Sequence, residues 1–234
     1  MQEAIILAGG LGTRLQKVLK NTPKAMAPVN GRPFLEYLIG FLKSFAISRI
    51  IVSVGYRSEQ IISFFGSEYK GLEIDYAIEK EPRGTGGGIR LAMLRCNSKN
   101  VFAINGDTLF TADLSDLAEK HFISNKPVSI ALRKVDDVSR YGSVSINEKN
   151  IVTAFGEKST YSIPGLINAG IYLLNRDYFL AQTGPGNFSI EKDCFEKWVS
   201  KGQVSGYPYD AYFLDIGVPQ DYLRAQHEFG RFTY

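Results

Sequence analysis

The sequence contains very little cysteine or histidine. Its 234 residues include two of each, Cys96, Cys194, His121 and His227. They stand singly, with no CxxC, HxxxH or HExxH spacing, which argues against a structural or hydrolytic zinc site and against a disulfide framework. Neither histidine lies in a turn beside a strand, where a catalytic base would sit, so we expect all four residues to serve packing or the surface. Chemistry by this chain is therefore expected to use carboxylates, lysine, arginine, backbone amides and a hard metal ion.

Long apolar runs and a strong net charge are also missing. No apolar run approaches 18 residues, and the start, MQEAIILAGG, lacks the basic region of a signal peptide. Lys plus Arg number 27 and Asp plus Glu number 24, so the formal charge of +3 is too small to favour nucleic-acid binding. We expect a cytoplasmic protein with reduced thiols that binds neither membranes nor nucleic acid.

The first 135 residues alternate between strand and helix patterns. The expected strands are 4–8, 49–54, 72–78, 100–104 and 127–134, and the expected helices are 33–46, 59–65, 87–94 and 114–122. This alternation implies right-handed βαβ units and a mostly parallel sheet with helices on both faces.

The pattern changes after about residue 140. Strand patterns at 142–146, 151–155 and 167–174 are separated by polar turns, and helices follow at 190–201 and 219–229. We predict one α/β domain over residues 1–234, with a Rossmann-like, doubly wound, mixed but mostly parallel sheet and antiparallel additions in its C-terminal half. Ligands of such sheets bind at the carboxyl ends of the strands. The polar and glycine-rich segments 9–14, 79–88, 105–107 and 215–217 are therefore expected to form one site there.

The segment LAGGLGTR, residues 7–14, follows the first strand directly. Its three glycines allow backbone N–H groups to approach a phosphate chain, and Arg14 adds a cation that can bind phosphate through two hydrogen bonds. A dinucleotide GxGxxG is excluded because Leu15 stands at its third glycine, and the Gly-Lys-Ser/Thr of a Walker A loop is absent. The alternative is a tight structural turn.

Lys24 lies between prolines in TPKAMAP, which we expect to be a stiff, extended loop carrying a mobile lysine. Such a lysine can act as a point charge on a phosphate. The alternative is a solvated surface lysine.

The glycine segment followed by Pro23-Lys24 resembles the signature of the sugar-1-phosphate nucleotidylyltransferases, and later segments match in order over nearly the whole chain. The resemblance implies a GT-A-like nucleotidyltransferase fold, with a nucleotide-binding half at 1–135 and a sugar-phosphate-binding half at 136–234. It implies catalytic roles for Arg14, Lys24 and Asp107. The residues that it implies for nucleotide binding are Leu7, Ala8, Gly9, Gly10, Gly12, Thr13, Arg14, Glu79, Pro82, Gly84, Thr85 and Gly106.

Glu79 begins the segment EKEPRGTGGG, which resembles the family's base-recognition loop, where many members have glutamine. Guanine presents two adjacent donors that a carboxylate can accept, whereas uracil and thymine present an edge that repels a carboxylate. This difference contributes on the order of 1–3 kcal/mol and favours GTP. The alternative is a solvated acid at the end of a strand.

Asp107 and Asp215 each follow an apolar strand, in NGD and FLDIG. Two carboxylates together with substrate phosphate oxygens suit Mg²⁺, and the resemblance implies that these two residues bind the catalytic metal. A helix cap is the alternative for Asp107. The resemblance assigns the sugar phosphate to Tyr141, Gly142, Glu157, Lys158, Asn168 and Gly170.

The Glu79 loop and the FLDIGVP segment resemble most the guanylyltransferases that act on D-glycero-α-D-manno-heptose 1-phosphate. That branch implies GTP and this sugar 1-phosphate as substrates, and GDP-heptose for capsule, surface-layer or lipopolysaccharide glycans. Three alternatives stay open: a mannose 1-phosphate guanylyltransferase, an N-acetylmuramate 1-phosphate uridylyltransferase and a non-catalytic nucleotide-sugar sensor. The sensor would be expected to lose Arg14, Lys24 or an aspartate, and all are present. The sequence leaves a homodimer open.

Overall fold

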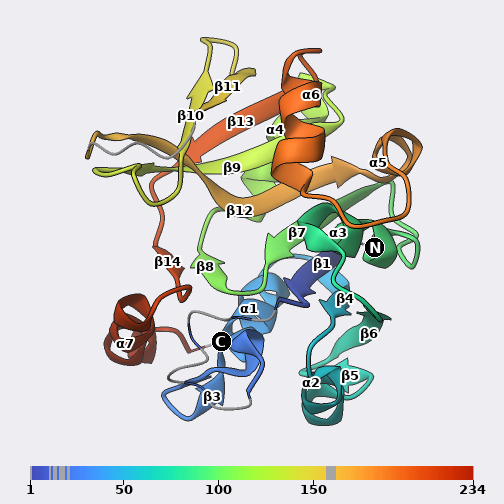
Figure 1. Cartoon of the computed structure of the whole chain (residues 1–234), viewed down its shortest axis with the longest axis vertical. Coiled ribbons are helices and arrows are strands. Elements are labelled where there is room, and N and C mark those ends of the chain that lie inside the picture. The colour runs from blue at the N-terminus through green and yellow to red at the C-terminus, as the bar shows by residue number, and fades with distance from the viewer. Residues whose placement is uncertain are drawn as a thin grey trace.

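A computed structural model describes residues 2–10, 12, 15, 19, 22–156 and 162–233 of the chain. Its centre is an eight-stranded sheet with the strand order β13-β9-β12-β7-β1-β4-β6-β5 (Figure 1). The strands are β1 (Gln2–Ala8), β4 (Ile47–Val54), β5 (Glu68–Tyr69), β6 (Leu72–Ile78), β7 (Asn100–Asn105), β9 (Val128–Val135), β12 (Gly165–Asn175) and β13 (Val204–Tyr209). Strand β12 runs antiparallel to both of its neighbours and β5 antiparallel to β6, while the other neighbours pair in parallel. The predicted mixed, mostly parallel α/β sheet is confirmed.

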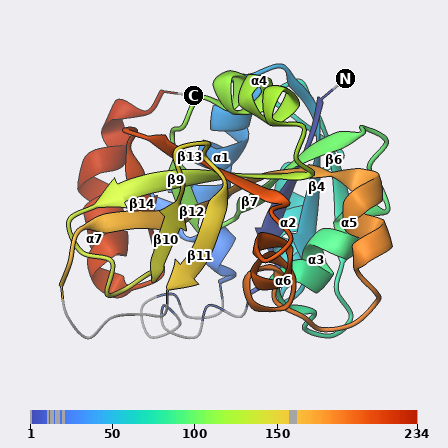
Figure 2. The same cartoon turned by 90° about the horizontal axis from the view of Figure 1, so that it is seen from above.

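Helices cover both faces of this sheet. They are α1 (Phe34–Lys43), α2 (Ser58–Phe65), α3 (Gly84–Met93), α4 (Leu114–Ser124), α5 (Arg176–Gln182), α6 (Glu196–Val199) and α7 (Pro219–Glu228). Side chains of α1, α2, α4 and α7 share one buried core, and side chains of α3, α5 and α6 share the other. Figure 2 shows α4 on one side of the sheet and α3, α5 and α6 on the opposite side. Because successive side chains of a strand point to opposite faces, Ile6 belongs to the first core and Ile5 to the second.

Three two-stranded sheets supplement the central one. Strand β10 (Ser143–Ile146) pairs with β11 (Val152–Gly156), β8 (Thr108–Phe110) with β14 (Phe213–Asp215), and β2 (Pro28–Val29) with β3 (Arg32–Pro33), all antiparallel. The predicted antiparallel additions in the C-terminal half are thus present as β10, β11, β12 and β14. Of these pairings, the β8–β14 ribbon joins segments about a hundred residues apart in the sequence.

Helix α3 begins three residues before its predicted start at residue 87. The glycines in its first turns lowered the sequence-based helix expectation, because glycine is a poor helix former. The structure indicates why small residues stand there. A Cβ on Gly84 would lie 2.5 Å from the carbonyl oxygen of Phe188, and one on Gly86 would overlap the Phe188 ring. The glycines therefore let a distant loop pack directly against the start of α3.

The helix expected at residues 190–201 is also different. Its first part, η2 (Ile190–Phe195), is a π-helix, and only α6 is α-helical. Strand β13 was not predicted because Gly206 and Pro208 interrupt its pattern. It forms because it lies at the edge of the sheet, where a proline is tolerated, and because Gly206 faces Leu132 too closely for a side chain. Helix α5 was not predicted either.

The scarce residues occupy packing and surface positions, as predicted. Cys96 and Cys194 are buried and are free thiols in the described part of the chain, and His227 is exposed. His121 is buried, with Nδ1 2.8 Å from Ser129 Oγ and Nε2 3.3 Å from Asn100 Oδ1. Within the described ranges no helix combines the length and the apolar composition needed to cross a membrane.

An ion-pair network lies at the amino end of the sheet. Arg49 of β4 contacts Glu3 at 2.7 Å, Glu73 at 2.7 Å and Asp75 at 2.8 Å. Glu3, on β1, is only 1% exposed, and its other carboxylate oxygen accepts hydrogen bonds from two backbone N–H groups, those of residues 97 and 98. This network fixes β1 against β4 at the end of the sheet opposite to the strand-end loops.

Candidate active site

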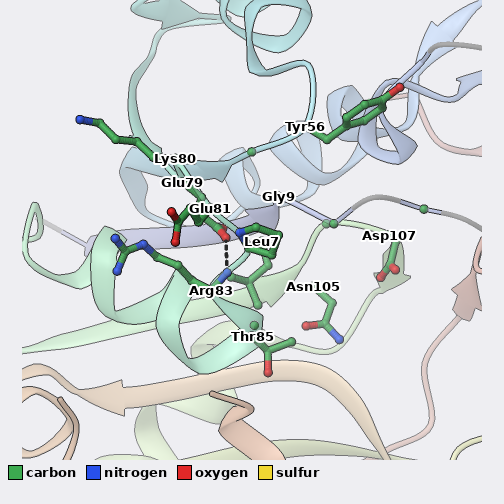
Figure 3. A pocket seen from close by; sticks show the side chains of 16 residues that line it. Leu7, Gly9, Tyr56, Glu79, Lys80, Glu81, Arg83, Thr85, Asn105 and Asp107 are labelled. Atoms are coloured by element: carbon green, nitrogen blue, oxygen red, sulfur yellow. Dashed lines mark hydrogen bonds between the residues drawn. The ribbon is translucent and has the colours of Figure 1, made fainter. Parts of the chain in front are cut away.

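A cavity of about 740 Å³ opens at the carboxyl ends of the parallel strands (Figure 3). Its lining comes from the loops after β1, β4, β6 and β7. Residues of three of the four predicted segments, 9–14, 79–88 and 105–107, therefore meet at this cavity, because parallel strands point their carboxyl ends to the same edge of the sheet.

Most of the predicted nucleotide-binding residues line this cavity. They are Leu7, Gly9, Gly10, Gly12, Glu79, Pro82, Gly84, Thr85 and Gly106, joined by Asp107. Ala8 is buried within β1 and is not among the lining residues, and Thr13 and Arg14 lie outside the described residues. Gly55 and Tyr56, which also line it, lie outside the predicted segments, whereas the further lining residues Lys80, Glu81, Arg83 and Asn105 lie within the predicted segments 79–88 and 105–107 but were given no individual role. Their position directly after predicted strands was the signal available.

The floor of the cavity is backbone packed against backbone. The Gly106 N–H donates a hydrogen bond to the Leu7 carbonyl over 2.9 Å, and a Cβ on Gly106 would overlap that same oxygen. A Cβ on Gly55 would lie 3.0 Å from the Gly9 carbonyl. Side chains are thus excluded where the loops after β1, β4 and β7 converge, which leaves room for a ligand to approach the main chain.

Glu79 is held in a defined orientation at the end of β6. Its Oε1 accepts a hydrogen bond from Ser53 Oγ over 2.8 Å, and its Oε2 accepts one from the Arg83 N–H over 3.1 Å, drawn as a dashed line in Figure 3. The carboxylate also lies against Gly9, where a Cβ would approach Oε1 to 2.5 Å. A carboxylate has about four acceptor sites, so two engaged sites leave capacity for a ligand's donors.

Lys24, Asp107 and Asp215 meet beside the cavity. The Lys24 Nζ lies 2.6 Å from Asp107 Oδ2 and 3.7 Å from Asp215 Oδ1. The two aspartates are held by the β8–β14 ribbon, in which Asp215 pairs with Thr108 and the Ile216 N–H donates to the Asp107 carbonyl. Asp107 precedes β8, so it is not the cap of a helix; Asp113 caps α4 instead.

The predicted setting of Lys24 is wrong. The residue begins a short 3₁₀ turn, η1 (Lys24–Met26), and its side chain is only 13% exposed and ion-paired, so the loop is not extended and the lysine is not free. Pro23 precedes the turn directly, but the proline spacing alone did not predict a turn there. The consequence is a fixed ammonium group whose position is determined by two carboxylates.

The two carboxylates form an electrostatically strained pair. Burial raises the pKa of the Asp215 carboxyl and the nearby negative charge of Asp107 raises it further, while Lys24 opposes both effects. A site that crowds two acids in this way favours a cation between them. The donor set fits a divalent metal, because two carboxylates leave the remaining positions to phosphate oxygens and water. Within the described residues no third His, Cys, Asp or Glu joins the pair.

The predicted sugar-phosphate residues are only partly described. Tyr141 packs edge-on against Phe213 of β14, with ring centroids 5.6 Å apart, and Gly142 follows it with a positive φ of 81°. In β12, Gly170 lies so close to Asn105 that a Cβ would be 2.6 Å from its Nδ2. Asn168, two residues earlier, accepts a hydrogen bond from the Gly170 N–H. These four residues thus adjoin the β7 and β14 ends of the site, whereas Glu157 and Lys158 lie outside the described residues.

Comparison with known families and proteins gives consistent matches over the whole chain. The family described as nucleotidyl transferase matches residues 3–231. A D-glycero-alpha-D-manno-heptose 1-phosphate guanylyltransferase from Aneurinibacillus thermoaerophilus is 42% identical over 226 residues, which cover 97% of each chain. A protein of the same name from Campylobacter jejuni is 42% identical over 220 residues, covering 94% of this chain and 96% of that one.

A solved structure has the same architecture. HddC from Yersinia pseudotuberculosis matches with a TM-score of 0.87 and 36% sequence identity, and the match covers 98% of this chain and 100% of that one. HddC has also been solved in complex with GMP-PN, with the same TM-score.

Proposed function

Because the chain belongs to the nucleotidyl transferase family, we propose that it transfers a guanylyl group from GTP to D-glycero-α-D-manno-heptose 1-phosphate, giving GDP-heptose and pyrophosphate. The observation that carries this proposal is the placement of three acids: Glu79 and Asp107 line one cavity, and Asp215 shares the Lys24 ammonium with Asp107. Asp107 and Asp215 flank Lys24, and Glu79 stands apart from Asp107 in Figure 3. The heptose guanylyltransferase relatives at 42% identity and the neighbour HddC, solved with GMP-PN, support the same substrates.

The chemistry requires little beyond positioning and charge. An oxygen of the sugar phosphate attacks the α-phosphorus of GTP, a new P–O bond forms, and the bond from the α-phosphorus to the bridging oxygen breaks. The electron pair leaves with pyrophosphate. The nucleophile is already an anion, so no general base is needed, and the enzyme must gather polyanions and neutralise the developing charge. The scarcity of histidine and cysteine agrees with such a reaction.

Lys24 supplies one fixed positive charge for this purpose. Arg14 and Lys158, both outside the described residues, are proposed to supply two more, on the triphosphate and on the sugar phosphate. Nucleotidyltransferases of this family use a divalent metal ion. We propose that this ion is Mg²⁺ and that Asp107 and Asp215 hold it. When bound, Mg²⁺ supplies charge neutralisation to the phosphate oxygens.

Glu79 is proposed to select the base. The hydrogen bonds from Ser53 and the Arg83 N–H fix its two oxygens, and the remaining acceptor sites match guanine N1–H and N2–H₂. Uracil and thymine place an acceptor beside their donor, so the same carboxylate repels them. Ser53 is fully buried in β4, which keeps this geometry rigid.

The direct test is pyrophosphate release with each of the four nucleoside triphosphates and a panel of sugar 1-phosphates, with and without EDTA. We expect the highest kcat/KM for GTP with the manno-heptose 1-phosphate, and loss of turnover after metal removal that Mg²⁺ restores. Preference for mannose 1-phosphate or for UTP with N-acetylmuramate 1-phosphate would replace the assigned substrates. Binding of GTP without turnover of any pair would indicate a sensor.

Base selection has its own test. Glu79→Gln should lower kcat/KM for GTP by about 5- to 150-fold, as expected for loss of about 1–3 kcal/mol, and should lower the rate with UTP much less. Glu81→Gln is the matched control, since Glu81 is an exposed acid of the same loop that also lines the cavity. Equal losses with both nucleotides would contradict the carboxylate–guanine pairing.

A further inference from the structure

A second polar cluster lies between helix α3 and strand β12, centred on Glu191 of the π-helix η2. Glu191 Oε2 accepts hydrogen bonds from Thr85 Oγ1 over 2.8 Å and from Ser189 Oγ over 2.7 Å. Its Oε1 accepts one from the Tyr172 hydroxyl over 3.3 Å. Three hydroxyls, from α3, from β12 and from the residue that caps η2, therefore converge on one carboxylate that the sequence reasoning did not select.

This carboxylate links the two sides of the active site. On one side, Thr85 stands in the first turn of α3 and lines the cavity. On the other side, the Tyr172 hydroxyl accepts a hydrogen bond from Asn168 Nδ2 over 2.9 Å. Asn168 Oδ1 in turn accepts from the N–H of Gly170, which packs against Asn105 of the cavity lining. A continuous chain of hydrogen bonds thus runs from Thr85 to Asn168.

The donor and the acceptor of each hydrogen bond in this chain are fixed. An ionised carboxylate only accepts hydrogen bonds, so Tyr172 and Thr85 must both donate to Glu191. Thr85 Oγ1 also accepts from the Ile190 N–H over 3.0 Å, which leaves its single hydrogen for Glu191. Burial raises the pKa of Tyr172 and the Glu191 charge raises it further, so the phenol keeps its proton. Because the Tyr172 hydroxyl gives its hydrogen to Glu191, it can only accept from Asn168, so the Asn168 Nδ2 faces Tyr172 and its Oδ1 faces the Gly170 N–H.

The π-helix explains how Glu191 reaches both partners. A π-turn widens the helix locally and redirects the side chains in it, and such turns are common at functional sites. Ser189 caps η2 by accepting the Lys192 N–H over 3.2 Å, and the Gly86 N–H donates to the Phe188 carbonyl over 3.0 Å. The segment that carries Glu191 is therefore tied to the start of α3 through its backbone as well.

We propose that Glu191 is a positioning residue that couples the two half-sites, so that a nucleotide bound beside Thr85 strengthens the binding of the sugar phosphate beside Asn168. This inference rests on the proposed function for the identity of the two ligands. Coupling between sites is reciprocal, so the sugar phosphate must strengthen nucleotide binding by the same factor. Hydrogen-bonded networks of this kind transmit a change in one member to the others because their bonds are mutually dependent.

The binding test measures that factor by calorimetry. The probes are a GTP analogue with a methylene group between the α- and β-phosphorus and D-glycero-α-D-manno-heptose 1-phosphate, each titrated alone and in the presence of the other. In the unaltered protein we expect the second ligand to lower the Kd of the first by about 5-fold or more. In Glu191→Gln and Tyr172→Phe this ratio should fall to within about 2-fold of unity. Lys192→Ala, an exposed neighbour in the same turn, should keep the original ratio.

A second test needs no ligand. Thr85→Val and Tyr172→Phe do not touch each other, so their effects on the unfolding constant should be independent unless Glu191 links them. Each single variant should raise the unfolding constant. In the double variant we expect an increase about 5-fold smaller than the product of the two single increases. In a Glu191→Gln background we expect the increase to equal that product. Thr85→Ser, which keeps the hydroxyl, should behave like the unaltered protein.

The outcomes separate this proposal from the proposed function. Equal weakening of both ligands with an unchanged coupling ratio, or independent effects in the ligand-free test, would overturn the role of Glu191. A different substrate pair in the pyrophosphate assay would overturn the substrate assignment alone, and the coupling ratio is then measured with that pair. If no pair turns over, the ligand-free test decides the coupling by itself.

Discussion

Lys24 donates a hydrogen bond to Asp107 over 2.6 Å although 83 residues separate them in the sequence. The same ammonium lies 3.7 Å from Asp215. Lys24 therefore occupies the position between two carboxylates that a divalent cation would favour. Under the proposed metal assignment, the lysine and the metal would compete for the same oxygens in the free protein, and a bound triphosphate would offer the lysine an alternative partner.

Replacing this lysine should separate metal binding from catalysis. In Lys24→Met we expect Mn²⁺ to bind the nucleotide-free protein more tightly, because the competing ammonium is gone, while kcat falls by about 10²-fold or more through loss of a charge that stabilises the transition state. Electron paramagnetic resonance of free Mn²⁺ and pyrophosphate release measure the two effects. Lys80→Met, which removes an exposed lysine of the cavity lining, is the control. Unchanged Mn²⁺ binding in Lys24→Met would contradict the competition.

Two glycines of the cavity should differ in how alanine affects stability. Gly106→Ala places a Cβ against the Leu7 carbonyl, so we expect β1 and β7 to separate locally and the free energy of unfolding to fall by about 1–3 kcal/mol. Among the described residues, no atom lies within 4 Å of a Cβ added at Gly10. Gly10→Ala should therefore leave stability within about 0.5 kcal/mol and raise the KM for GTP, because this loop is proposed to wrap the triphosphate. Urea denaturation and steady-state kinetics distinguish the two. An equal stability loss in both variants would contradict the open space at Gly10, and an unchanged KM for GTP in Gly10→Ala would contradict its proposed use.

The ion-pair network at the opposite end of the sheet should affect stability alone. Arg49→Met leaves the buried Glu3 carboxylate without its cation, and we expect a loss of about 3–5 kcal/mol. Arg95→Met, which removes a half-exposed partner of Asp75, should lose less than about 1 kcal/mol. Chemical denaturation gives both values, and kcat of each folded variant should match that of the unaltered protein. A selective fall in kcat for Arg49→Met would contradict the separation between network and site.

Stability should also fall between neutral and mildly acidic pH because of His121. Burial lowers the pKa of His121 to about 4, whereas the unfolded chain titrates near 6.5. Between these values the unfolded state binds the extra proton, so the contribution is complete above about pH 6.5 and decreases as the pH falls toward 4. From pH 7.5 to 5.0 the loss is about 2 kcal/mol.

The matching variant is His121→Gln, which keeps hydrogen-bonding groups without a titrating ring. We expect it to lose about 2 kcal/mol less than the unaltered protein over the same pH interval. His227→Gln, at an exposed position on α7, should leave the pH dependence unchanged. Identical pH profiles for His121→Gln and the unaltered protein would contradict the assignment.

The sequence predicted the parallel core and the location of the cavity for one physical reason. Buried parallel strands read as apolar runs, and polar segments that follow such runs must lie at the same edge. This reasoning found Glu79 and Asp107 but could not find Glu191, which reads as an ordinary acid in a helical segment. Its function depends on Thr85 and Tyr172, which are brought to it only by tertiary packing. The fixed position of the Lys24 ammonium was missed for the same reason, since it is determined by acids far along the chain.

The β8–β14 ribbon has a consequence for the order in which activity is acquired. Asp107 is made early on the ribosome and Asp215 late, and α7 afterwards packs on the N-terminal segment, where Tyr222 and Gln226 both donate to the Pro28 carbonyl. A nascent chain can form the strands around Glu79 before these contacts exist. The carboxylate pair, however, forms only when β14 has paired with β8, so under the proposed function a nascent chain that ends before β14 lacks the site to which the metal ion is assigned.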